Sequence, residues 1–219
     1  AEVPTLAVED VEIKENSSAL YDEMIALRLG LSPIKTDLKS YNFKQDCKCE
    51  GEGCARCELK LTLKGNKKGY VLATEAKSND PKCEFVYAMP IVKLLPKQKI
   101  ELQMTAILGT GKEHAKWGSG WAWYHGWPEF KTTAQSDVQA CQKNGVLEAK
   151  GSTLQIKNIL KWNEATEQLC EENGVTVDYS EKDLIFNLES WGQLSCKEIL
   201  NQTVEILVKK TEEFEELIK

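Results

Sequence analysis

The chain has 219 residues, of which 42% are hydrophobic and 28% are charged, a balance typical of a globular protein with one large or two small domains. No apolar run approaches the ~18 residues that span a bilayer, and the chain does not begin like a secretory signal, so we expect a cytoplasmic protein without a membrane partner. The net charge is -6 and only Arg28 and Arg56 are arginines, which disfavours direct binding to nucleic-acid phosphates. The lysines are scattered among glutamates along the sequence.

The first segment, residues 3–13, alternates apolar and polar side chains and predicts a strand. The Asn-Ser-Ser run at residues 16–18 offers an N-cap for a helix, which Gly30 and Pro33 would end. Apolar residues at helical spacing are predicted to face the core from this helix: Leu20, Met24, Leu27 and Leu31.

Residues 37–104 predict mostly β structure. The alternation of apolar residues places strands at residues 59–63, 70–72 and 100–104, with glycines and asparagines between them. Residues 109–128 are rich in Gly and Trp and predict a loop.

Residues 130–178 predict the order strand, helix, strand, strand, helix, strand, and residues 184–188 predict a further strand. A long helix should then run from about Ser195 to Lys219. Its apolar positions form one face: Ile199, Leu200, Val204, Leu207, Val208, Phe214, Leu217 and Ile218. Such an apolar face packs within its own chain or pairs with a partner chain. Taken alone, the pattern favours packing within the chain.

The strongest chemical signal is a group of four cysteines at Cys47, Cys49, Cys54 and Cys57. Two chelating pairs, C-x-C and C-x-x-C, bracket a Glu-Gly-Glu-Gly turn whose glycines let the backbone reverse. Four thiolates suit a tetrahedral structural Zn²⁺ with no open position for substrate, and the spacing disfavours four unrelated thiols. An iron–sulfur cluster also takes four thiolates, so the metal stays open between zinc, which is favoured, and iron.

Several long segments, read together in order, carry a family resemblance. They are Val3–Ile13, Glu15–Glu23, Arg28–Ile34, Pro90–Leu95, Leu108–Trp117 and Phe186–Gly192. The chain resembles the D subunit of archaeal DNA-directed RNA polymerase, the counterpart of the bacterial α subunit and of the third-largest subunit of eukaryotic RNA polymerase II. The resemblance covers nearly the whole chain, and the cysteine group stands where relatives bind zinc.

The resemblance implies an α+β fold made of an RNA polymerase α-type dimerisation domain and a mainly-β inserted domain. The dimerisation domain would comprise residues 1–15 and 175–219, and the inserted domain residues 16–129. Residues 130–174 resemble a degenerate ferredoxin-like insert. Ferredoxins bind their clusters through the pattern C-x2-C-x2-C-x3-C-P. In this segment only Cys141 and Cys170 stand at ligand positions of that pattern, so an iron–sulfur cluster is disfavoured in the insert.

The resemblance also implies a structural assembly subunit without an active site of its own, in a nucleotidyltransferase complex whose chemistry belongs to the large subunits. The expected partners are the L subunit of the polymerase as heterodimer, the small N and P subunits, and the large catalytic subunits, with DNA reached only indirectly. The alternatives are a free-standing zinc and iron–sulfur redox module resembling ferredoxin, and a zinc protein that binds nucleic acid, which lacks the basic helix it would need.

His114 and His125 are lone histidines beside aromatic residues. We expect each to be packed within the protein or to face a partner. Four tryptophans are expected to be buried or at a protein interface, in preference to stacking on bases: Trp117, Trp121, Trp123 and Trp127. Cys83 and Cys196 are expected to be small buried hydrophobic residues.

The sequence departs from its relatives in three places. Leu27 stands where relatives carry His, and Gly118-Ser119 where they usually carry Gln-Pro. Relatives also begin with a further strand and helix, so we expect either a fragment or a second polypeptide that supplies them; the sequence leaves both open.

Overall fold

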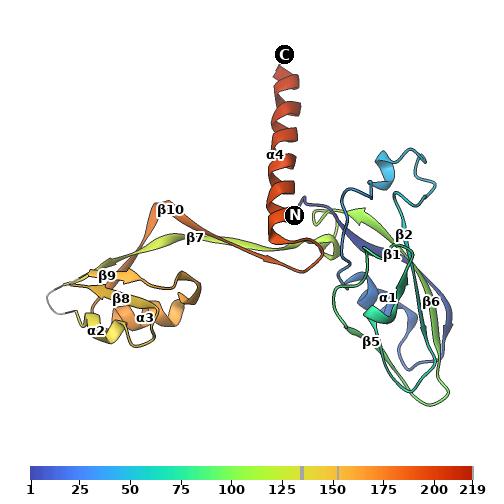
Figure 1. Cartoon of the computed structure of the whole chain (residues 1–219), viewed down its shortest axis with the longest axis horizontal. Coiled ribbons are helices and arrows are strands. Elements are labelled where there is room, and N and C mark those ends of the chain that lie inside the picture. The colour runs from blue at the N-terminus through green and yellow to red at the C-terminus, as the bar shows by residue number, and fades with distance from the viewer. Residues whose placement is uncertain (134–135, 152, 219) are drawn as a thin grey trace. The chain divides into compact units, whose positions relative to one another are not determined.

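The computed structural model describes residues 1–133, 136–151 and 153–218. The described chain divides into two units, the first formed by Ala1–Trp121 with Leu188–Lys219, and the second by Ala122–Asn187 (Figure 1). Helices and antiparallel strands occur in both, which confirms the α+β class. None of the described helices is long and apolar enough to cross a membrane.

The first unit contains a four-stranded sheet in the order β1-β6-β2-β4. Its strands are β1 (Thr5–Asn16), β6 (Ile100–Gly109), β2 (Leu59–Gly65) and β4 (Lys77–Ser78). β6 pairs antiparallel with both β1 and β2. Alternate residues of β2 are buried, so the period-2 pattern in the sequence identifies this strand correctly.

Beside this sheet lie β3 (Gly69–Leu72) and β5 (Pro90–Leu94), which pair antiparallel. Strand β5 is not among the strands that the alternation of apolar residues predicts. Short 3-10 helices occur at Lys44–Asp46, Ala73–Glu75, Ala115–Trp117 and Ile159–Lys161.

Helix α1 (Asp22–Gly30) packs on the core through Ile25 and Leu29, which are fully buried. The predicted core-facing stripe is therefore wrong at Met24, Leu27 and Leu31, which are exposed, with Leu27 at 54%. Leu20, the fourth predicted residue, is partly buried and packs against the core. The predicted N-cap is also wrong. Helix α1 begins after Tyr21 without a side-chain cap, and the Asn16 side chain instead closes the preceding turn by donating to the carbonyl of Leu20 at 2.9 Å.

Strands β7 (Gly120–Lys131) and β10 (Thr176–Ser190) form a two-stranded ribbon. The loop predicted at residues 109–128 is thus wrong from Gly120 onward. Most β7 side chains are exposed on both faces of the ribbon, so the sequence has no reason to alternate apolar and polar residues and the strand signal is absent. The strand predicted at residues 184–188 is part of the longer β10.

The second unit follows the predicted order of elements. After β7 come α2 (Val138–Cys141), β8 (Leu147–Lys150), β9 (Thr153–Ile156) and α3 (Glu164–Glu172), and then β10. β8 and β9 form a hairpin. The buried core of this unit consists of Cys141, Leu147, Leu154, Cys170 and Val175.

The last element of the first unit is α4 (Cys196–Ile218), a helix of 23 residues (Figure 1, red). It packs on its own chain near its start, where Ile199 is buried with Val3 and Leu194. Most of its other apolar side chains are exposed. The prediction that the apolar face packs within its own chain is therefore wrong beyond the first turns. The predicted last residue, Lys219, lies outside the described residues.

Candidate functional site

The four clustered cysteines lie in a loop between the 3-10 helix Lys44–Asp46 and strand β2. The loop reverses through three left-handed positions among its acidic and glycine residues: Glu50 (φ 53°), Gly51 (φ 86°) and Gly53 (φ 99°). A Cβ at position 53 would also lie 2.6 Å from a carboxylate oxygen of Glu58, so any larger residue would displace that carboxylate. The glycines predicted to reverse the backbone therefore do so.

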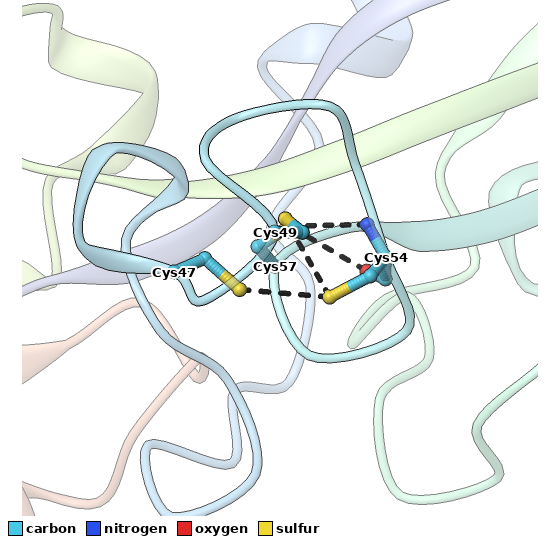
Figure 2. A group of neighbouring side chains, drawn as sticks. All are labelled: Cys47, Cys49, Cys54 and Cys57. Atoms are coloured by element: carbon cyan, nitrogen blue, oxygen red, sulfur yellow. Dashed lines mark hydrogen bonds between the residues drawn. The ribbon is translucent and has the colours of Figure 1, made fainter.

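The loop brings all four sulfur atoms within 4.8 Å of one another, and Figure 2 shows the four side chains converging. The Sγ–Sγ distances are 3.5 Å for Cys47–Cys54, 3.5 Å for Cys49–Cys57 and 3.8 Å for Cys54–Cys57. An ion held by four Zn–S bonds of about 2.3 Å separates its sulfurs by about 3.8 Å. The donor set and spacing therefore fit a four-coordinate metal ion, and the cluster could bind a metal such as zinc.

Backbone N–H groups favour the thiolate form at part of this cluster. The N–H of Gly53 hydrogen-bonds the Cys49 sulfur and lowers the pKa of that thiol to about 6. The N–H of Cys54 donates to the Cys57 sulfur at 3.2 Å, yet burial raises the pKa of Cys57 to about 12. Burial thus favours the neutral form of the Cys57 thiol, and a bound cation would favour its thiolate.

The base of the loop is fixed by polar contacts. The Glu58 carboxylate pairs with the Lys44 ammonium at 2.9 Å and with the Lys60 ammonium at 2.8 Å. The N–H of Asn42 donates to the carbonyl of Arg56 at 2.8 Å. The two ends of the loop are thus held together by contacts that do not involve the sulfurs.

The remaining cysteines behave differently from one another. Cys83 is buried in the core of the first unit, as expected, whereas Cys196 is exposed, which makes that prediction wrong. Cys141 and Cys170 are fully buried in the core of the second unit, where a hydrogen bond joins their thiols. Among the described residues, the loop cysteines are the one group of three or more side chains placed to hold a metal.

The two histidines lie beside aromatic rings, and His125 meets the Tyr179 ring edge-on. His114 is exposed, accepts the N–H of Lys116 at 3.1 Å through Nδ1, and meets the Trp117 ring edge-on. Only Trp117 is buried among the four tryptophans named above, and Trp121 is 61% exposed. The side chains of β7 thus leave aromatic surface uncovered.

Helix α4 also leaves an apolar face uncovered. Residues three, four or seven apart present Leu200, Val204, Leu207, Val208, Phe214 and Ile218 to solvent, with Leu207 57% and Phe214 65% exposed. A stripe of this length on a helix of a globular unit is typical of a surface that another chain covers.

Known proteins are similar to this chain over most of its length. The sequence model of the family described as "RNA polymerase Rpb3/RpoA insert domain" matches residues 11–119. DNA-directed RNA polymerase subunit Rpo3 of Methanosphaera stadtmanae is 37% identical over 233 aligned residues, which cover 96% of this chain and 84% of the relative. The Rpo3 proteins of Methanosarcina acetivorans and Archaeoglobus fulgidus are each 34% identical and cover 97% and 100% of this chain, with 84% and 86% of their own lengths.

Proposed function

The chain belongs to the family of the archaeal DNA-directed RNA polymerase subunit Rpo3, and on that premise we propose that it is the assembly subunit of the enzyme, the D subunit, which pairs with the L subunit. The heterodimer takes up the small N and P subunits and supports docking of the large catalytic subunits in the cytoplasm, and DNA is reached only through these partners. In this proposal residues 1–15 and 175–219 form the dimerisation domain and residues 16–129 the inserted domain.

The observation that carries the pairing is the exposed stripe of α4. The helix uses only one flank inside its own chain, where Ile199 packs with Val3 and Leu194. The adjoining face exposes large aliphatic and aromatic side chains over about five turns. A partner helix of the same chemistry would bury this face, and each large apolar side chain that it covers contributes about 1.5–3 kcal/mol.

The four-cysteine loop contributes structure, not chemistry, in this proposal. Cys47, Cys49, Cys54 and Cys57 hold one Zn²⁺, which ties the loop down at the edge of the inserted domain. Four protein ligands leave no position for water or substrate.

Residues 130–174 act as a ferredoxin-like insert that has lost its clusters. Cys141 and Cys170 pack side by side within an apolar core, and two thiols are too few for a cluster that needs four. An iron–sulfur absorbance band that disappears on substitution of Cys141 or Cys170 would overturn this assignment.

The pairing is tested by co-expressing the tagged chain with the L subunit and measuring the complex by size-exclusion chromatography and calorimetry. We expect a one-to-one complex. Leu207→Gln should weaken it about 10- to 100-fold, because a polar amide would then be buried in the interface.

Lys209→Gln provides the matched control on the same helix. Lys209 is exposed, and its only described ion pair is a long one with Glu213 at 3.8 Å. This variant should bind the L subunit like the parent chain. Equal loss in both variants, or no complex with the parent chain, would contradict the proposed pairing.

A further inference from the structure

Two lysine-bearing turns lie side by side at one end of the first unit. One turn, residues 66–68, joins β2 to β3, and the other, residues 95–99, joins β5 to β6 (Figure 1). Gly65 pairs with Ile100, and Gly69 pairs with Leu94, so the two turns leave neighbouring strand ends. Five lysines lie in these turns or beside them, and we call this group the lysine tip: Lys67, Lys68, Lys93, Lys97 and Lys99.

The lysine tip is a positive patch on a negative chain. All five side chains are exposed, and within the described residues none of the five ammonium groups forms an ion pair. The nearby acid Glu101 is already paired with Lys64 at 2.7 Å. The full sequence has a net charge of -6, so these five lysines form a locally positive surface on a chain that is acidic overall.

The backbone at Lys97 is held in an unfavourable conformation. Its φ is +70°, in the left-handed region where glycine is favoured. Gln98 fixes this turn: its side-chain oxygen accepts the N–H of Leu95 at 2.7 Å, and its own N–H donates to the carbonyl of Leu95 at 3.2 Å. A lysine therefore occupies a position where glycine would be more stable, which indicates a use for its side chain.

Apolar side chains are exposed among these charges. Tyr70 is 61% and Leu95 is 53% exposed, and the Lys93 ammonium lies 5.3 Å from the centre of the Tyr70 ring. The surface thus offers apolar contact and positive charge together, a combination that suits a protein segment better than bare phosphates.

We propose that the lysine tip binds an acidic protein segment that carries apolar side chains between its carboxylates. The carboxylates face the lysines of both turns, and apolar side chains cover Leu95 and Tyr70. Nucleic acid fits less well, because the tip contains no arginine for bidentate phosphate contacts and Leu95 has no counterpart on a phosphate backbone.

The test is a fluorescence-anisotropy titration of the full chain with three labelled probes. The first is an acidic peptide with Leu and Phe between Asp and Glu, the second is the same peptide with Ser at the apolar positions, and the third is single- or double-stranded DNA. We expect the first peptide to bind best, and its affinity to fall as salt screens the exposed charges.

Three variants locate the site. Lys67→Glu with Lys68→Glu should weaken binding of the first peptide about tenfold. Lys97→Gly should weaken it about two- to fivefold while raising the melting temperature, because glycine relieves the left-handed strain. Lys143→Glu with Lys157→Glu, exposed lysines of the second unit, makes the same charge change elsewhere and should leave binding within about twofold.

Three results would overturn the proposal. The first is absence of peptide binding at low salt by a parent chain whose circular dichroism is native. The second is an equal loss in the control variant, which reports net charge alone. The third is DNA binding that depends on Lys67 and Lys68 without binding of the first peptide, which would make the tip a nucleic-acid surface.

Discussion

The sulfur atoms of the cysteine loop are placed by neighbours that are not ligands. Glu58 fixes the base of the loop through Lys44 and Lys60, and the glycine at position 53 makes room for that carboxylate. These contacts hold the base of the loop without using any of the four sulfur atoms. Because the ligands are thiolates, the bound ion should be released as acid protonates them.

Cys57→Ser tests this arrangement at the residue scale. We expect the parent chain to carry one zinc per chain by elemental analysis, and the variant to carry none and to melt about 5–10 °C lower. Cys196→Ser, which removes an exposed thiol outside the loop, should keep both the zinc and the melting temperature. If the parent chain carried iron in place of zinc, the metal would be reassigned but the site would stand. If Cys57→Ser still carried one zinc per chain, Cys57 would not be a ligand.

At the scale of elements, α4 begins with a capping box that the sequence contains as Ser195 followed by Glu198. The N–H of Ser195 donates to the Glu198 carboxylate at 2.8 Å, and the Ser195 hydroxyl also donates to it at 2.6 Å. These hydrogen bonds, the one from the side chain first, lower the pKa of Glu198 below its ordinary value. The start of α4 is thus fixed where Ile199 enters the core.

The lowered pKa of Glu198 gives a pH dependence with a definite sign. The carboxylate stabilises the folded chain fully above its ordinary pKa of about 4.5, and this contribution is lost as the pH falls through the lower folded value. Ser195→Ala should lower the free energy of unfolding by about 1 kcal/mol at pH 7. Denaturant unfolding should show the deficit of Glu198→Gln shrinking below pH 4.5, and a constant deficit would contradict the assignment.

Two elements show where sequence patterns stop being decisive. Helix α1 carries apolar residues on two faces, and periodicity cannot tell that Ile25 and Leu29 face the core while Leu27 does not. Strand β7 buries neither face along most of its length, so its sequence does not need to alternate apolar and polar residues. By contrast, β2 buries one face only, and its alternation of apolar and polar residues predicts the strand correctly. The cysteine spacing likewise predicts a group of side chains that the fold does bring together. The lysine tip has no sequence signature, because its members come from separate turns.

At the scale of the whole molecule, the chain consists of two units with separate hydrophobic cores. The second unit is entered through β7 and left through β10, which pair with each other. The chain thus leaves the first unit along β7 and returns to it along the neighbouring strand β10. Removal of the insert therefore does not require the ends of the first unit to separate.

Deletion of residues 132–175, with Lys131 joined to Thr176 through an Asn-Gly turn, tests the independence of the units. Asn-Gly suits a tight hairpin between antiparallel strands. We expect the shortened chain to fold, to keep its zinc, and to melt within about 3 °C of the transition of the first unit in the parent chain. Loss of cooperative melting in calorimetry would mean that the first unit depends on the core of the second.

The exposed face of α4 also bears on the life of the newly made chain in the cell. A helix that leaves Leu207 and Phe214 in water gives chaperones and proteases an apolar segment to recognise until a partner hides it. Chains made in excess of their partner would then be cleared, while assembled chains would persist. The surface that we propose for pairing would thereby also decide whether an unassembled chain persists in the cell.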